Sequence, residues 1–270
     1  MLLLPGCDSG SDTSIFKQDA VRIGTKNNQP GTSTETATHG WSGFDVSVGE
    51  QLVKTLGKSG SGAHFSDVVS KQRESVLTTG AEDLVIATYS ITTDRTNKVY
   101  FAGPYAMTYQ GFLVRAGDPA WLHSLDDLAR KTVCTWSGTT SEEELDLQAP
   151  VKGYLVQHLT DAQACLTELR AGRAAALSTD QLILYGLQKE NPEMVVVPEV
   201  TIGVPNAYGI GIKKERLDDC IRIRDFLKDY ISSPAWTEAF DASLKVAGNP
   251  DLYRPQRSDI DAMSCKHLPG

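Results

Sequence analysis

The sequence predicts an α/β protein built from two lobes. Short apolar runs that suit buried strands alternate with helix-like segments in two stretches, residues 20–87 and 124–199. Such alternation indicates mostly parallel sheets with helices on their faces. Two further strand-like runs, 109–117 and 206–214, border the second stretch and would connect the lobes. The 270 residues, of which 40% are hydrophobic, are enough for two lobes with separate cores.

In the first stretch, apolar residues recur at helical spacing over 43–60, and the segment contains closing glycines. Residues 32–40 are polar and predict a loop, whereas 98–105 forms another apolar, strand-like run. The expected strands are 20–26, 63–69 and 83–87, and the expected helices are 43–60 and 71–80.

The second stretch repeats the pattern. Residues 124–136 predict a helix followed by a strand, and the Ser-Gly turn at 137–138 predicts the start of a helix that runs to 148. Residues 249–270, rich in Pro and Asp, predict an extended tail. The other expected elements are strands 174–180 and 193–199 and helices 162–172, 181–190, 216–232 and 234–244.

The charge balance excludes some function classes. Lysine and arginine total 26 against 34 acidic residues, a net charge of −8. A nucleic-acid-binding protein would need a basic face, so we expect no nucleic-acid partner. No apolar stretch reaches the length of a membrane span.

The first residues, MLLLPGCDSGSDTS, resemble the end of a bacterial lipoprotein signal. An apolar run and a small residue precede Cys7, which would carry the lipid, and the polar tract after it suits a flexible tether. The basic segment that usually begins such a signal is missing, which leaves the true start open; the alternative is a chance LPGC in a disordered terminal segment.

Four cysteines remain beyond Cys7, and none belongs to a CxxC pair or has a histidine at metal-ligand spacing. An even number in an exported chain predicts two disulfide bonds, with three pairings open; the alternative is buried free thiols. They are Cys134, Cys165, Cys220 and Cys265.

Polar side chains follow three predicted strands. In ATYSITTDR, hydroxyl groups that include Thr88 and Ser90 precede Arg95. An arginine fork flanked by hydroxyls suits a carboxylate, which it can bind through two parallel hydrogen bonds. The alternative is a surface pair between Arg95 and Asp94.

The second strand end is SGTTSEEE, where Thr139 and Thr140 open a helix whose free N–H groups attract anions. The alternative is a plain capping box of Thr139 and Glu142. The third is LSTDQL, where Asp180 would accept hydrogen bonds from an ammonium group or serve as an N-cap. Together these groups match an α-amino acid.

Signatures of common enzymes are absent from the sequence. It contains no GxSxG, P-loop, GxGxxG or HExxH, and its five histidines are scattered. We therefore expect no metal, no cofactor and no catalytic residues.

Four stretches together resemble the bacterial extracellular solute-binding proteins of family 3, the receptors of ABC importers for polar amino acids. The second of them is highly specific, and the similarity runs from about residue 20 to 245. The stretches are IGTKNNQPG with SGFDVSV, GAEDLVIATYSITTDRTNKVYFAGPY, SGTTSEEELD with CLTELRAGRAAALSTDQLILYG, and AYGIGIKK.

The resemblance implies a type II periplasmic-binding-protein fold, in which two crossing strands hinge two lobes. It implies lobe 1 at 20–108 and 207–250, lobe 2 at 109–206, a tail at 251–270 and a signal remnant with tether at 1–19.

The resemblance also implies roles for single residues. Arg95 would bind the ligand α-carboxylate, helped by Ser90 and the turn at Thr139–Thr140. Asp180 would accept the α-ammonium, together with the backbone near Thr88. In the glutamate- and aspartate-binding branch, Lys26 and Arg73 would reach the side-chain carboxylate.

Other features of that branch leave parts of the assignment open. Some of its members have a histidine at the position of Ala162, and many relatives have an aspartate at that of Asn28. The ligand therefore stays open among glutamate, aspartate, glutamine and asparagine. Both Cys134 and Cys165 are often cysteines in this branch, so the resemblance implies their bond and with it Cys220–Cys265, tying the tail to lobe 1.

The implied function is capture of a polar L-amino acid, glutamate first, by closure of the cleft. The implied partners are the amino acid, an ABC permease with its ATPase, and the membrane through the lipid on Cys7; the receptor would be a monomer on the outer face of the bacterial membrane. One alternative is a lipoprotein that senses the amino acid for a signalling partner, and another is an enzyme like cyclohexadienyl dehydratase.

Overall fold

The computed structural model describes residues 14–57, 62–117 and 121–269. Cys7, the expected lipid site, lies outside the described residues. Within them, no helix is both long and apolar enough to cross a membrane.

One sheet runs through both lobes in the order β5-β1-β6-β11-β7-β10-β8-β9. The outer strands pair in parallel on both sides, and the central strands β7 and β11 pair antiparallel to their neighbours. The strands are β1 Val21–Thr25, β5 Ala63–Asp67, β6 Leu84–Val85, β7 Tyr100–Arg115, β8 Thr132–Trp136, β9 Leu155–Leu159, β10 Ala176–Asp180 and β11 Met194–Ile212.

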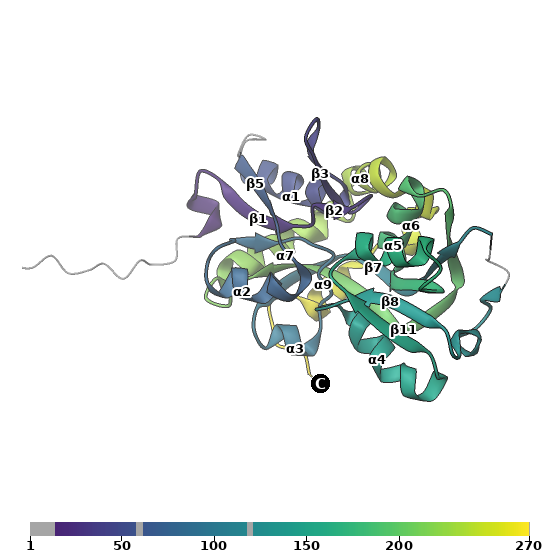
Figure 1. The fold of residues 1–270 in the computed structure, drawn as a ribbon. Coiled ribbons are helices and arrows are strands. Elements are labelled where there is room, and N and C mark those ends of the chain that lie inside the picture. The colour runs from purple at the N-terminus through teal and green to yellow at the C-terminus, as the bar shows by residue number, and fades with distance from the viewer. Residues whose placement is uncertain (1–13, 58–61, 118–120, 270) are drawn as a thin grey trace, which may run out of the picture.

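Strands β7 and β11 connect the lobes, because each is long enough to serve both. Their pairing runs from Met194 opposite Arg115 to Ile212 opposite Tyr100, with three register shifts on the way. Figure 1 shows α1, α2, α3 and α7 around one end of the sheet and α4, α5 and α6 around the other. The fold is therefore the expected two-lobe α/β arrangement.

The helices of the first lobe are mainly those near the two ends of the chain. Two further short helices, α2 and α3, connect strands of this lobe. The α-helices are α1 Phe44–Thr55, α2 Arg73–Thr78, α3 Thr93–Thr96, α4 Thr140–Lys152, α5 Ala162–Arg170, α6 Gln181–Glu190, α7 Leu217–Tyr230, α8 Pro234–Leu244 and α9 Arg257–Met263. The 3₁₀ turns are Ile15–Lys17, Ser70–Gln72, Leu125–Leu128, Lys245–Ala247 and Pro250–Leu252.

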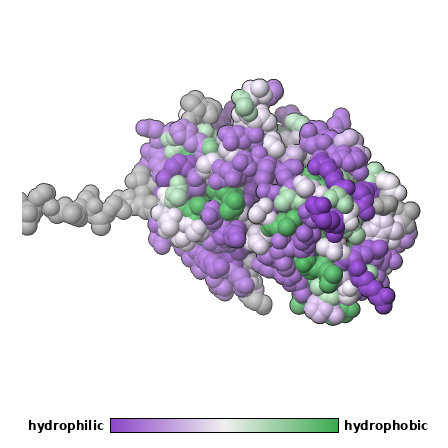
Figure 2. All heavy atoms as spheres, in the orientation of Figure 1, coloured by the Kyte–Doolittle hydropathy of each residue, from purple (hydrophilic) through white to green (hydrophobic). Residues whose placement is uncertain are grey.

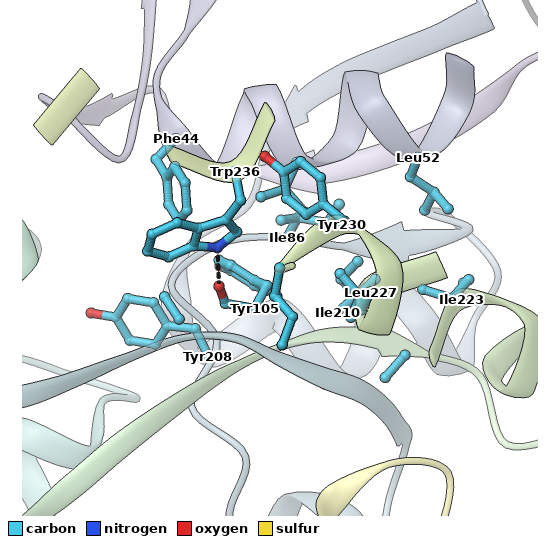
Figure 3. Packing of buried hydrophobic residues seen from close by; sticks show 14 of the residues in the cluster. Phe44, Leu52, Ile86, Tyr105, Tyr208, Ile210, Ile223, Leu227, Tyr230 and Trp236 are labelled. Atoms are coloured by element: carbon cyan, nitrogen blue, oxygen red, sulfur yellow. Dashed lines mark hydrogen bonds between the residues drawn. The ribbon is translucent and has the colours of Figure 1, made fainter. Parts of the chain in front are cut away.

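An aromatic cluster fixes the core of the first lobe (Figure 3). Phe44 of α1 meets Trp236 of α8 edge to face, with ring centroids 5.5 Å apart. The indole Nε1 of Trp236 donates to the carbonyl oxygen of Tyr105 at 2.8 Å, so its polar group is satisfied inside the core. This cluster ties α1 and α8 to β7, one of the two connecting strands.

Two disulfide bonds reinforce the lobes, and they are the pairs that the resemblance implies. Cys134–Cys165 joins β8 to α5, and Cys220–Cys265 joins α7 to the segment after α9. The alternative of buried free thiols is therefore wrong.

The structure corrects the sequence prediction in several places. Residues 32–40, expected as a loop, contribute to a small sheet of β2 Asn28–Gln29, β3 Ser33–Thr36 and β4 Gly40–Ser42. Antiparallel backbone ladders hold this ribbon, and Thr34 Oγ1 and Ser42 Oγ lie 3.3 Å apart across it. Its largely exposed side chains are polar, so the sequence lacks the apolar alternation of a strand.

The tail, expected to be extended, forms α9. Gln256 and Asp259 form a reciprocal capping box at its start, and Ile260 is fully buried against lobe 1. The buried side chain of Ile260 and the nearby disulfide bond at Cys265 stabilise this helix, whose polar sequence alone does not predict it. The runs 98–105 and 109–117, expected as separate strands, form the single strand β7, and the runs 193–199 and 206–214 likewise fall in the single strand β11.

Candidate functional site

A small cavity lies between the lobes, and most of the residues predicted to bind a ligand line it. Its walls come from the turn after β6 and the start of α2 in one lobe, and from the start of α4 and the end of β10 in the other. The enclosed volume is about 10 Å³, so the lobes must move apart to admit any solute larger than water. The lining residues are Gln29, Ser70, Arg73, Thr88, Ser90, Trp136, Thr139, Thr140, Ser141, Thr179, Asp180 and Ile183.

One carbonyl group joins two arginines across this cleft. The carbonyl oxygen of Gly138, in the turn between β8 and α4, accepts from Arg73 Nη2 at 2.8 Å and from Arg95 Nη2 at 3.2 Å. Gly138 has φ +82°, and a Cβ there would lie 2.6 Å from the backbone nitrogen of Lys71. A glycine is therefore required for the two lobes to approach this closely.

Arg73 is a buried cation whose hydrogen-bond partners are neutral. Besides Gly138, its guanidinium donates to the carbonyl oxygens of Ser70, Ala87 and Thr88 at 2.9, 3.2 and 3.4 Å. Across the described ranges, no carboxylate forms an ion pair with it. Burial, followed by the repulsion of Arg95, lowers the pKa of Arg73 to about 10, which still leaves it charged at neutral pH. Such a site favours an anionic group, because an unpaired buried charge is costly.

Arg95 is also buried, but it is placed differently. Its Nη1 donates to the carbonyl oxygen of Ser90 at 2.9 Å, and its Nε lies 3.6 Å from Glu74 Oε1. Its ion-pair partner is thus Glu74 and not Asp94. Arg95 is not among the residues that line the small cavity; it contacts the wall through the carbonyl oxygen of Ser90, which is a lining residue.

Asp180 ends β10 and faces the cavity from the second lobe. Its two oxygens accept from Asn206 Nδ2 at 2.6 Å and from the hydroxyl of Tyr208 at 2.7 Å. Its side chain does not cap α6, the alternative role. Burial raises the pKa of Asp180. A buried carboxylate with free lone pairs suits an ammonium group.

The hydroxyl groups at the cleft come from both lobes. Ser90 Oγ and Thr140 Oγ1 lie 3.4 Å apart across it. Thr139 is the N-cap of α4, and its Oγ1 accepts from the Glu142 backbone N–H at 3.1 Å. The capping role that the sequence offered as the alternative for Thr139 is therefore present. Thr139 nevertheless lines the cavity, and the start of α4 faces it.

Thr88 sits in a strained corner that a buried carboxylate stabilises. Its φ is +44°, unusual for a β-branched residue. Asp45 Oδ2 accepts from the Thr88 N–H at 2.8 Å, and Asp45 Oδ1 accepts from the Tyr105 hydroxyl at 2.7 Å. Burial raises the pKa of Asp45 to about 7. The side chain of Asp45 thus acts on the site through Thr88, whose carbonyl oxygen in turn accepts from Arg73.

Lys26 is not brought to the wall of the small cavity. It lines a neighbouring cavity of about 270 Å³ together with Asp67, Trp136 and Asp161. Its Nζ donates to the carbonyl oxygen of Val68. Burial, followed by the repulsion of Arg73, holds the pKa of Lys26 well below its usual value. Trp136 lines both cavities, so the two are adjacent.

Sequence reasoning missed several residues that complete the site. The ring of Tyr89 lies under both guanidinium groups, with its centroid 4.4 Å from Cζ of Arg73 and 5.2 Å from Cζ of Arg95. Asn206 and Tyr208 are two residues apart on a strand and therefore share a face, a signal that would have placed them together. Asp45 gave no such signal, because nothing local shows that its helix start is buried.

The fold and this cleft, with cations on one lobe and a carboxylate on the other, define a two-lobe solute-binding protein. The chain belongs to the bacterial extracellular solute-binding proteins, family 3, whose model matches residues 21–246. It is 33% identical to the glutamate-binding protein GluB of Corynebacterium glutamicum over 221 residues, which cover 78% of this chain and 74% of GluB.

A second relative is the ABC transporter glutamine-binding protein GlnH of Bacillus subtilis, 28% identical over 260 residues, or 91% of this chain and 93% of GlnH. Among solved structures, the solute receptor for L-cysteine of Neisseria gonorrhoeae matches with a TM-score of 0.82 at 22% identity, covering 90% of this chain and all of the receptor, and so supports the fold. These relatives are binding proteins, and the chain is accordingly a binding protein and not an enzyme.

Proposed function

We propose that the protein binds a polar L-amino acid outside the cytoplasm, L-glutamate first and L-aspartate second, and delivers it to an ABC importer. The observation that carries the proposal is the buried guanidinium of Arg73, which has carbonyl oxygens as partners in the structure as described. A ligand carboxylate would replace the Gly138 carbonyl oxygen and neutralise this charge.

The remaining charges fit an amino acid. Arg95 would bind the α-carboxylate with Ser90, and Asp180 would accept the α-ammonium. Arg73, with Lys26 in the adjacent cavity, would then serve the side-chain carboxylate. A second cation inside the cleft favours a ligand with two carboxylates over a neutral amide such as glutamine. The relative named as glutamate-binding, GluB, supports the same choice.

Binding would be coupled to closure. We place lobe 1 at 20–108 and 207–250, lobe 2 at 109–206 and the tail at 251–270, so that β7 and β11 form the hinge. A ligand that contacts Arg95 on one lobe and Asp180 on the other stabilises the closed arrangement through both sets of contacts.

Isothermal titration calorimetry with L-glutamate, L-aspartate and L-glutamine tests the ligand. We expect the largest affinity for L-glutamate. Absence of binding heat with all three amino acids would contradict the proposal, and a clear preference for L-glutamine would overturn the role given to Arg73.

The substitution Arg95→Ala tests the α-carboxylate clamp. It should weaken binding of every amino acid ligand by several kcal/mol, because the buried carboxylate would lose its charged partner. The matched control is Arg257→Ala, which removes an arginine from a surface ion pair with Asp229 and should leave the affinity unchanged.

We also propose that lipid on Cys7 anchors a monomeric receptor to the outer face of the bacterial membrane, beside its permease. Membrane fractionation of cells that express the wild type and Cys7→Ala tests the anchor. The wild type should sediment with membranes and the variant should be released; equal release of both would contradict it.

A further inference from the structure

A second and larger pocket, of about 650 Å³, lies beside the hinge. We call it the hinge pocket. Its walls come from the loop at Ile91–Thr93, from α4 at Glu143–Leu147 and from the C-terminal segment around Met263 and Leu268, and its floor comes from β7 and β11. Figure 1 shows the chain ending near α3, where Thr93 Oγ1 donates to the carbonyl oxygen of Pro269 at 2.9 Å.

A buried amide group lines this pocket without a partner. Gln110 of β7 is 2% exposed, and its Nε2 has no hydrogen-bond partner among the residues that the structure describes. Gln110 contributes to the floor of the hinge pocket, so an unpaired donor lies directly beside the space that a bound molecule would fill. Buried donors of this kind are uncommon and mark a place where a ligand or water completes the structure.

The hinge pocket is acidic and apolar at once. Glu143 and Glu144 lie on its wall, and the described part of that wall contains no lysine, arginine or histidine. The apolar side chains include Leu147 and Val204, which are 72% and 77% exposed. Figure 2 shows apolar surface gathered over the region of α4.

We propose that the hinge pocket binds a small amphiphilic cation, an ammonium group on a short apolar chain. The carboxylate of Glu143, which forms no ion pair within the described ranges, attracts the ammonium group. The apolar chain covers Leu147, Val204 and Met263, and a water molecule held beside the bound chain accepts from Gln110.

The position of the pocket couples it to the amino-acid site. Thr140 lines both the hinge pocket and the small cavity. Asn206 lines the hinge pocket and donates both to Asp180 Oδ1 and to Thr140 Oγ1, the latter at 3.2 Å. A molecule that contacts both lobes here favours their closed arrangement, so it raises the affinity for the amino acid, and the effect is reciprocal.

The experiment uses n-hexylammonium chloride as the probe on the full chain, followed by the NMR signals of glutamine side-chain amides. The Gln110 signal, identified by its loss in Gln110→Leu, should shift on titration. Hexanol and hexanoate, which have the same chain without the positive charge, should bind at least about tenfold more weakly. Equal binding of all three would overturn the role of the acidic wall.

A matched pair of variants locates the site. Glu143→Gln should weaken hexylammonium binding roughly fivefold. Glu238→Gln, which makes the same charge change at an exposed position of α8, should not alter it. Equal affinities of the two variants, or displacement of the probe by L-glutamate, would overturn the proposal.

The coupling rests on the proposed function and is measured separately. Saturating hexylammonium should lower the Kd for L-glutamate about threefold or more, and an unchanged or higher Kd would overturn the coupling. The binding titration does not involve the amino acid. If the chain binds no L-glutamate, the proposed function fails while the hinge-pocket result still stands or falls by itself.

Discussion

Buried charges with incomplete partners dominate the site at the scale of single residues. Arg73 is 3% exposed and Asp180 is 4% exposed, and both are solvated by neutral protein groups: carbonyl oxygens, an amide and a phenol. These neutral dipoles offset part of the free-energy cost of burying the two charges. A ligand with charges of opposite sign would stabilise them further.

Arg73→Gln should therefore change selectivity more than general affinity. We expect L-glutamate affinity to fall about 100-fold or more, because a buried ligand carboxylate would lose its cation. L-glutamine affinity should fall less than about tenfold, because glutamine retains a donor. Calorimetry with both ligands measures the ratio; Arg170→Gln, at an exposed ion pair with Glu193, is the control. Equal losses for both amino acids would refute the role of Arg73.

Asp45 should make stability depend on pH. Burial raises its pKa from 3.8 to about 7, against the pull of Lys26 and Arg73 and the hydrogen bonds from Tyr105 and Thr88. The folded protein thus holds this proton more tightly than the unfolded chain does. Its stabilising contribution is complete below pH ~4 and is lost as the pH rises through ~7.

Urea unfolding of the wild type and Asp45→Asn at pH 5 and pH 8 measures this contribution. We expect the free energy of unfolding of the wild type to fall by about 2–3 kcal/mol more than that of the variant between the two pH values. Asp180, whose pKa is also raised, remains in both proteins and cancels in the comparison. The exposed control Asp241→Asn should keep the wild-type pH dependence, and an Asp45→Asn protein that does likewise would contradict the assignment.

At the scale of single elements, disulfide bonds stabilise two parts of the fold. Cys220–Cys265 closes a 45-residue separation and holds the segment after α9 against α7, where Ser264 also exchanges hydrogen bonds with Gly103. Cys134–Cys165 closes a 31-residue separation within the second lobe.

Replacing Cys220 and Cys265 together by serine should lower the free energy of unfolding by about 4 kcal/mol, from the loop entropy returned to the unfolded chain. Hydrogen exchange should accelerate in α9. The double variant at Cys134 and Cys165 provides the comparison: it should cost a similar amount without accelerating exchange in α9. Unchanged exchange in α9 of the first variant would show that its packing alone holds it.

The sequence predicted elements whose signal is local. The apolar periods of α1, α5, α6, α7 and α8 and the strand ends at Arg95 and Asp180 could be found without knowledge of distant residues. The polar ribbon at Ser33–Thr36 and the helix α9 could not, because backbone pairing with neighbouring strands and a disulfide bond stabilise them. The roles of Asp45 and Asn206 were not predicted either, because their hydrogen-bond partners lie 43 and 26 residues away in the chain.

At the scale of the whole molecule, the main feature is the close backbone contact between the two lobes. At Gly186 of α6, a Cβ would lie 1.7 Å from the carbonyl oxygen of Pro30 in the other lobe. Together with Gly138, this glycine lets the second lobe rest directly on the first. Neither approach can relax by rotating a side chain, because the atoms met are backbone atoms.

Gly186→Ala should hinder closure without weakening the lobes. Alanine favours a helix over glycine, so the free energy of unfolding should stay the same or rise by up to about 1 kcal/mol. The affinity for L-glutamate should fall about tenfold or more, and small-angle scattering should show a larger radius of gyration with ligand than in the wild type. Gly117→Ala, at an exposed glycine with open space around it, is the control. Wild-type affinity in Gly186→Ala would contradict the closure.

The sharing of β7 and β11 by both lobes affects any attempt to divide the protein. A cut at 108/109 and 206/207 would split both strands in mid-ladder and expose unpaired backbone on each fragment. Exposed edges of this kind recruit other chains. Separate expression of the lobes should therefore yield aggregates, and complementation from fragments should succeed where the break falls in a surface loop instead of at the hinge.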